Sequence, residues 1–217
     1  MDNMLSESRL LEGAEALELT LAPGAAARLI WFAEELLRWN RKVNLTAITS
    51  PEEVLEKHLL DCLAVLPALA GSGSLLDLGA GAGLPGIPLC LARPSLQVTL
   101  VDAVAKKVGF IKHAIAQLKL APGARGVHQR AGGRPEAEGL PKVEVVIARA
   151  LMDLGPWLQL AEAYVRPGGR AIAMLGQAPG LEQARGVAPG GLELVELRHY
   201  ELPFSKHPRA LAIYTKR

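Results

Sequence analysis

The sequence predicts an α/β fold with a mostly parallel β-sheet, helices on both faces of the sheet and a helical cap at the N-terminus. Two patterns support this prediction. From residue 74 onward, short apolar segments alternate with helical segments, which is typical of sheets built from βαβ units. The segments before that point have helical rather than strand-like spacing. We therefore expect a cap over residues 1–70 and one compact sheet domain over residues 71–217.

The cap should contain two amphipathic helices. Residues 25–39 place leucine, isoleucine and alanine side chains on one face, and we expect this helix to end before Asn40. The second helix should begin at Ser50, which can accept a hydrogen bond from the first turn. Pro51 suits the first helical position, and Glu53 would complete a capping box with Ser50.

The sheet domain should alternate strands and helices. Five strands are expected near residues 74–78, 97–101, 126–129, 143–148 and 170–175. Helices between them are expected near residues 85–92, 105–120 and 153–165. Two further strands, near residues 192–199 and 209–215, should extend one edge of the sheet in antiparallel orientation.

Composition narrows the class of protein. The 217 residues are 50% hydrophobic, so the chain can bury a large core without disulfide bonds. Its 2 cysteines cannot form a disulfide framework, and we find no signal peptide and no apolar run of membrane-spanning length. We therefore expect a cytoplasmic protein. With only 3 Trp, 3 Tyr and 3 Phe, the chain is not expected to hold single-stranded nucleic acid on a sheet of stacking rings.

Basic residues are concentrated in one part of the chain. Between Asp102 and Glu136 there are seven Lys or Arg residues and no acidic residue. Such a stretch can neutralise nucleic-acid phosphates, although a solvated helix face followed by a basic loop explains it equally well. Our candidates for phosphate contact are Lys106, Lys107, Lys112 and, near the C-terminus, Arg209.

A glycine-rich turn follows the first expected strand. Residues 79–86 read Gly-Ala-Gly-Ala-Gly-Leu-Pro-Gly and lead into an expected helix, which is where α/β sheets bind nucleotides. Glycine lets the backbone adopt positive φ and approach a ligand closely. Asp77 is placed to meet a cationic ligand, and Asp102, at the end of the next strand, can accept hydrogen bonds from both ribose hydroxyls.

The turn alone does not identify the cofactor. Residues 81–86 also match the Gly-x-Gly-x-x-Gly pattern of dinucleotide enzymes, which use an acid at the position of Asp102 too. Asp77 favours S-adenosylmethionine, and the Tyr-x-x-x-Lys motif of short-chain dehydrogenases does not occur. An NAD-linked oxidoreductase on a related fold is the alternative.

Several short motifs occur in order along the chain. They are Trp-Asn-Arg-Lys-Val-Asn-Leu-Thr at 39–46, Lys-His-Leu-Leu-Asp-Cys at 57–62, the glycine turn at 77–88, Val-Asp-Ala at 101–103, Ala-Arg-Ala at 148–150 and Ala-Met-Leu-Gly at 173–176. Together they resemble the bacterial 16S ribosomal RNA guanine-N7 methyltransferases, the methyltransferase G family also called glucose-inhibited division protein B. The resemblance extends from about residue 31 to the C-terminus.

This resemblance implies a Rossmann-like fold of class I S-adenosylmethionine-dependent methyltransferases. It also implies methyl transfer to guanine N7 of 16S ribosomal RNA, at the family's target nucleotide 527, on free RNA or the small ribosomal subunit. We expect a monomer. The cofactor-binding residues would be Asp77, Gly79, Gly81, Gly83, Leu84, Asp102, Ala131, Gly132 and Arg149. The chain departs from the family in having Gly132 where an acid is usual and Leu175 where lysine is usual.

Guanine N7 carries a free lone pair, so its methylation requires no general base and no metal is expected. Alignment of the reacting atoms can then supply the catalysis. We expect Asn44, His58 and Asp61 to border the pocket of the target base, which must leave its stack to react. His58 and Asp61 share a helix face, so a purely structural local pair is the alternative. The two departures also leave open a relative that binds the cofactor but has lost catalysis.

Overall fold

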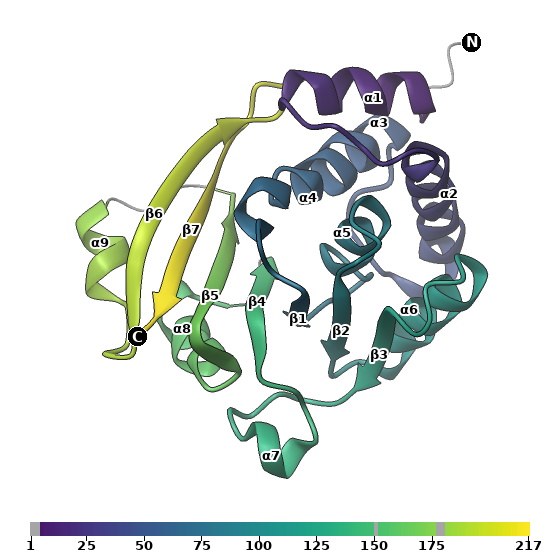
Figure 1. Ribbon diagram of the computed structural model, residues 1–217. Helices are drawn as coiled ribbons and strands as arrows, with labels where there is room; N and C mark the ends of the chain where they lie inside the picture. The colour runs from purple at the N-terminus through teal and green to yellow at the C-terminus, as the bar shows by residue number, and fades with distance from the viewer. Residues whose placement is uncertain (1–4, 150–151, 177–180) are drawn as a thin grey trace.

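The computed structural model describes residues 5–149, 152–176 and 181–217, and it forms one seven-stranded sheet (Figure 1). The strand order is β3-β2-β1-β4-β5-β7-β6. Strands β1 to β5 run parallel to one another, and β7 and β6 extend the β5 edge in antiparallel orientation. The strands are Ser74–Leu78 (β1), Gln97–Asp102 (β2), Ala124–His128 (β3), Val143–Arg149 (β4), Val165–Leu175 (β5), Leu192–Glu201 (β6) and Pro208–Lys216 (β7). The predicted mostly parallel sheet with an antiparallel edge is confirmed.

Helices cover both faces of the sheet. In the first part of the chain they are Glu7–Ala16 (α1), Ala25–Val43 (α2), Pro51–Val54 (α3), the π-helical turn Leu55–Leu60 (η1), Asp61–Leu63 (α4) and the 3-10 turn Leu66–Leu69 (η2). Those that follow are Gly86–Ala92 (α5), Ala105–Gln117 (α6), Pro135–Glu138 (α7), Leu154–Glu162 (α8) and Leu181–Gly186 (α9). None of the helices in the described part of the chain is long and apolar enough to cross a membrane.

The pleat of the strands divides the apolar side chains between two cores. In β4, Val145 and Ile147 face the core under the N-terminal helices, whereas Val146 and Ala148 face the core under α8. The first core also contains Phe32 of α2, which packs on Phe110 of α6. The N-terminal helices and the sheet therefore share one core, and the division into a cap and a sheet domain stays a prediction.

Several local expectations differ from the structure. Helix α2 does not end before Asn40 but continues to Val43, because Asn44 adopts φ +51°, a left-handed conformation that asparagine tolerates. Ser50 accepts a hydrogen bond from the amide of Glu53 as expected, but the Glu53 carboxylate pairs with Lys57 and does not close the capping box. The helix expected at 153–165 ends at Glu162, since β5 begins at Val165.

Helices α1, α7 and α9 were not anticipated. The buried stripe of α1 consists only of Leu10, Gly13 and Ala14, so its apolar pattern is weak. Gly13 lets α1 approach Leu60 of η1 so closely that a β-carbon would collide with that leucine side chain. Helix α1 thus depends on a tertiary contact that local periodicity does not reveal.

Candidate functional site

A cavity of about 300 Å³ lies where the carboxyl ends of β1, β2 and β4 meet. This is the edge at which open α/β sheets bind ligands. The residues lining the cavity come from the glycine turn, from the loop after α2, from the ends of β2 and β4 and from the first turn of α6. They are Leu45, Thr46, Gly79, Ala80, Gly81, Ala82, Leu84, Asp102, Lys107 and Arg149.

The structure brings together part of the predicted cofactor set. Gly79, Gly81, Leu84, Asp102 and Arg149 all line the cavity. The cavity lining does not include the remaining predicted members, so their contacts with a cofactor stay predictions. Those members are Asp77, Gly83, Ala131 and Gly132.

The glycine turn is fixed by backbone hydrogen bonds to the next strand. The amides of Gly79 and Ala80 both donate to the carbonyl of Val101, at 2.8 and 3.0 Å. Gly79, Gly81 and Gly83 have positive φ values of 72°, 57° and 79°. A β-carbon on Gly81 would have only one neighbouring atom within 4 Å, the carbonyl oxygen of Gly79 at 3.9 Å, so this glycine keeps space free in the turn.

Asp102 is held by two backbone amides at the base of the cavity. Its Oδ2 accepts a 2.8 Å hydrogen bond from the amide of Gly81, and its Oδ1 accepts one of 2.8 Å from the amide of Val104. Each carboxylate oxygen can accept a second hydrogen bond. The carboxylate is therefore oriented before any ligand arrives.

Asp77 lies beneath the turn and is completely buried. Its Oδ2 accepts a 2.8 Å hydrogen bond from the amide of Gly86, the first residue of α5. Its Oδ1 has no hydrogen-bond partner among the described residues. Burial raises the pKa of Asp77 to about 7. Asp77 thus braces the start of α5 from below.

Arg149, at the end of β4, connects the cavity wall to the η1 turn. Its guanidinium donates to the carbonyl of Lys57 at 2.8 Å and to Nδ1 of His58 at 3.2 Å. It also lies 3.6 Å from Oδ2 of Asp61. Asp61 is therefore an ion-pair partner of Arg149.

His58 and Asp61 are both buried, and each contacts a different element. His58 Nε2 lies 2.8 Å from the hydroxyl of Thr46, whereas Asp61 Oδ1 accepts a 2.7 Å hydrogen bond from Tyr200 of β6. No hydrogen bond joins His58 to Asp61 in the described parts of the chain, so the local pair offered as the structural alternative is not what the structure shows. Burial, with the neighbouring Arg149, lowers the pKa of His58 to about 3.

Asn44 is exposed and is not part of the cavity lining; its neighbours Leu45 and Thr46 line the cavity instead. Thr46 and Tyr200 were missed as site residues. Thr46 lies in the 39–46 motif, which was a signal for it, but Tyr200 lies outside the quoted motifs and only the fold brings it to Asp61.

A second loop, after β3, carries Ala131 and Gly132, two of the expected cofactor-binding residues. The amide of Gly132 donates to Oε1 of Glu138 at 3.0 Å, and the amide of Gly133 donates to the hydroxyl of Tyr164 at 2.8 Å. A β-carbon on Gly132 would lie 3.0 Å from the same Glu138 oxygen. Gly132 lacks the acidic side chain usual in the family, but the carboxylate of Glu138 in α7 lies beside this loop.

The basic candidates for RNA contact differ in their surroundings. Lys106 and Lys112 are exposed on α6, whereas Lys107 lines the cavity. The guanidinium of Arg209 is turned inward, with Nε 3.6 Å from Oδ1 of Asp61. Lys106 and Lys112 are thus free to meet an external phosphate, and Arg209 is committed to a buried carboxylate.

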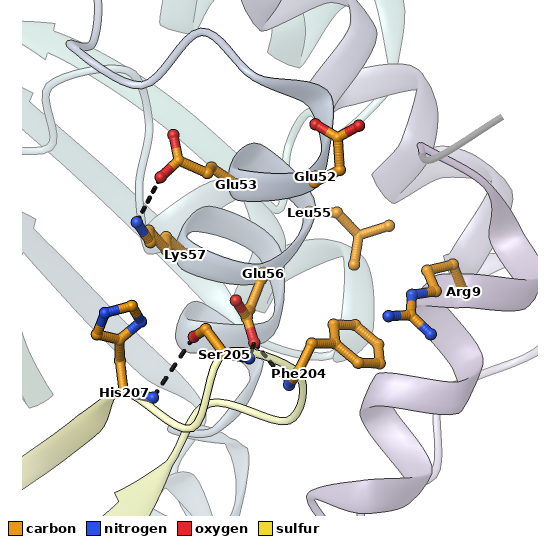
Figure 2. A pocket seen from close by; sticks show the side chains of 9 residues that line it. All are labelled: Arg9, Glu52, Glu53, Leu55, Glu56, Lys57, Phe204, Ser205 and His207. Carbon is orange, nitrogen blue, oxygen red and sulfur yellow. Dashed lines mark hydrogen bonds and ion pairs between the residues drawn. The ribbon is translucent and has the colours of Figure 1, made fainter. Parts of the chain in front are cut away.

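A larger cavity of about 370 Å³ lies away from the glycine turn, between α1, η1 and the turn that joins β6 to β7 (Figure 2). Glu56 points at this turn and accepts 2.7 Å hydrogen bonds from the amides of Phe204 and Ser205. The guanidinium carbon of Arg9 lies 3.5 Å from the centroid of the Phe204 ring. These contacts attach the β6–β7 turn to the N-terminal helices, which is a structural role.

Comparisons with known proteins agree with this geometry. A family model described as GidB, rRNA small subunit methyltransferase G, matches residues 25–205. The chain is 57% identical over 217 residues to the ribosomal RNA small subunit methyltransferase G of Myxococcus xanthus, covering 100% of both chains. It is 42% identical over 214 residues to the protein of that name from Syntrophotalea carbinolica, covering 97% of this chain and 98% of the other.

Solved structures share the fold at low sequence identity. The N-methyltransferase NodS from Bradyrhizobium japonicum, in complex with S-adenosyl-L-homocysteine, matches with a TM-score of 0.57 and 14% identity, over 85% of this chain and 98% of that one. TrmN from Thermus thermophilus matches with a TM-score of 0.56 and 22% identity, over 73% of this chain and 48% of that one. The fold is that of class I methyltransferases, as expected.

Proposed function

The chain belongs to the rRNA small subunit methyltransferase G family, GidB, and from this premise we propose that it transfers a methyl group from S-adenosylmethionine to guanine N7 of 16S ribosomal RNA. The observation that carries the proposal is the cavity in which the glycine turn of β1 faces the fixed carboxylate of Asp102. We extend it to the family's target nucleotide 527 and to a monomer acting in the cytoplasm. The substrate is free 16S ribosomal RNA or the small ribosomal subunit.

The residues of the cavity fit S-adenosylmethionine. The glycine turn leaves space at Gly81, and Asp102 retains acceptor capacity for two ribose hydroxyls. Arg149 and Lys107 place positive charge beside the same cavity, where a carboxylate of the cofactor can pair with it. When bound, S-adenosylmethionine supplies a methyl group activated by a sulfonium.

The protein's own residues then have three tasks: to hold the cofactor, to orient the base and to exclude water. Guanine N7 reacts through its lone pair, so no side chain has to remove a proton from it. His58, with its pKa lowered to about 3, is neutral and adds no positive charge near the cavity. We assign His58 and Asp61 as positioning residues, because they hold Thr46 and Arg149 at the cavity wall.

The decisive experiment maps N7-methylguanine in 16S ribosomal RNA from cells with and without the gene, by reduction and cleavage at the methylated base. We expect one position that is methylated only when the gene is present. Complementation with a variant carrying Asp102→Ala should fail to restore the modification. An unchanged modification pattern in cells lacking the gene would overturn the proposal.

Titration calorimetry with the purified protein tests the alternatives. S-adenosylmethionine should bind and NADH should not, whereas binding of NADH alone would indicate an oxidoreductase. A protein that binds S-adenosylmethionine but leaves both 16S ribosomal RNA and small subunits unmethylated would be the impaired relative suggested by Gly132 and Leu175.

A further inference from the structure

The hydroxyl of Thr46 lies at the wall of the cavity and has no role in the proposed reaction. Thr46 is half-buried in the loop that follows α2, and it lines the cavity with the glycine turn. The side chain of Asn40 fixes the conformation of this loop through three hydrogen bonds. It accepts hydrogen bonds from the amides of Leu45 and Thr46, at 2.6 and 2.9 Å, and donates one of 2.9 Å to the carbonyl of Thr46.

The proton arrangement around Thr46 follows from Arg149. His58 Nδ1 lies 3.2 Å from two groups, the guanidinium of Arg149, which can only donate, and the carbonyl of Lys57, which can only accept. We assign Nδ1 as the acceptor nitrogen of a neutral ring, because the guanidinium is charged and the carbonyl already accepts a 2.8 Å hydrogen bond from Arg149. The ring proton then lies on Nε2. His58 therefore donates its 2.8 Å hydrogen bond to the oxygen of Thr46.

This donation leaves the Thr46 hydroxyl in a defined state. Its oxygen accepts one hydrogen bond from His58 Nε2 and a second, of 3.1 Å, from the amide of Ile48. A hydroxyl has two acceptor positions and one proton. Both acceptor positions are filled, and within the described residues no acceptor is within hydrogen-bonding distance of the proton. Thr46 is thus a fixed donor at the wall of the cavity.

We propose that the Thr46 hydroxyl donates a hydrogen bond to O6 of the target guanine and so selects guanine over adenine. This inference rests on the proposed function. Guanine presents two acceptors, N7 and O6, on the edge that must face the cofactor, whereas adenine presents an N6 amino donor beside its N7. Because the Thr46 hydroxyl can only donate here, it stabilises a bound guanine through O6. A bound adenine would place its N6 amino donor against the hydroxyl donor, which is unfavourable.

The test separates base recognition from loop structure. We compare the wild type, Thr46→Ser, which keeps the hydroxyl, and Thr46→Val, which keeps the shape and loses it. The substrate is ligated 16S ribosomal RNA with guanine or 2-aminopurine at the target position, given as free RNA and in reconstituted small subunits. The readouts are kcat/KM for the RNA and the Kd for S-adenosylmethionine.

On guanine, Thr46→Val should lower kcat/KM about tenfold, the loss of one hydrogen bond, and Thr46→Ser should stay near the wild type. On 2-aminopurine, which lacks O6, wild type and Thr46→Val should be equal, and the cofactor Kd should not change. An equal loss on both bases would show a structural role for Thr46 and overturn the inference.

Two other outcomes are also decisive. A cofactor Kd that weakens about tenfold in Thr46→Val would mean that the hydroxyl serves the carboxylate of S-adenosylmethionine, which overturns the inference. Failure of the wild type to methylate the guanine substrate in either form would instead refute the proposed function on which the inference rests.

Discussion

The phenol hydroxyl of Tyr200 donates a 2.7 Å hydrogen bond to Oδ1 of Asp61, 139 positions away in the sequence. Asp61 in turn lies 3.6 Å from both Arg149 and Arg209. Burial raises the pKa of Asp61, and the hydrogen bond from Tyr200 together with the two arginines opposes that rise. Tyr200, on the antiparallel edge of the sheet, therefore stabilises the charged form of Asp61, which positions Arg149 at the cavity.

We expect Tyr200→Phe to lower the free energy of unfolding by about 1–3 kcal/mol, because a buried carboxylate loses a hydrogen bond. It should also weaken S-adenosylmethionine binding several-fold by loosening Arg149. Urea denaturation and calorimetry measure the two effects. The matched control is Tyr214→Phe, since Tyr214 donates to the carbonyl of Ala184, away from the cavity. Equal cofactor affinity in both variants would contradict the role of Tyr200.

Gly81→Val tests the glycine turn. Gly81 has a φ of 57° and lines the cavity, so a β-branched side chain at this position would strain the turn and occupy ligand space. We expect the affinity for S-adenosylmethionine to fall more than tenfold. Gly168→Val is the control, because Gly168 has φ 74° with no atom within 4 Å of a β-carbon and is not part of the cavity lining. Comparable affinity in the two variants would mean that the turn does not bind the cofactor.

Local sequence predicted most of the sheet because its strands are short apolar runs between turn residues. It also located the glycine turn and Asp102, since these lie at strand ends, whereas Arg149 was expected from the family resemblance. Tyr200 lies on a half-exposed antiparallel strand, and only the register of β6 on β7 places it near Asp61. The burial of Asp77 beneath the turn likewise depends on how α5 packs, which the sequence pattern does not specify.

His58 should make stability depend on pH. Its pKa is lowered from 6.5 to about 3 in the folded chain. Between these values the unfolded chain binds a proton that the folded chain does not, so the free energy of unfolding decreases as pH falls from 6.5 toward 3. The slope is at most about 1.4 kcal/mol per pH unit. Subtracting the stability profile of His58→Gln from that of the wild type should isolate this slope, and parallel profiles would disprove it.

Asp77 should affect the pH dependence of stability in the direction opposite to that of His58. Its pKa is raised from 3.8 to about 7, so between these values the folded chain holds a proton that the unfolded chain releases. Its contribution to stability therefore decreases as pH rises from 3.8 to 7. Asp77→Asn keeps an acceptor for the amide of Gly86 and should remove this decrease. Asp77→Ala leaves that amide without its acceptor and should cost about 1–3 kcal/mol at any pH. A pH profile of Asp77→Asn that matches the wild type would refute the assignment.

Lys106 and Lys112 should supply part of the affinity for RNA. Both are exposed on α6, the helix that begins just after Asp102, and neither lines the cofactor cavity. Each phosphate contact adds close to one unit to the slope of log affinity against log salt. We expect Lys106→Glu with Lys112→Glu to weaken binding of 16S ribosomal RNA more than tenfold at low salt and to flatten that slope, with an unchanged Kd for S-adenosylmethionine.

The control for this double variant carries the same change in net charge elsewhere. Arg185→Glu with Arg217→Glu reverses two arginines that pair with Glu182 and Glu193 on the surface, outside the cavity lining. If RNA binding depended only on net charge, both double variants would lose affinity equally. A local phosphate contact predicts that the lysine variant loses far more, most clearly near 0.1 M salt, where screening limits the reach of surface charges to about 10 Å. Filter binding at several salt concentrations distinguishes the two.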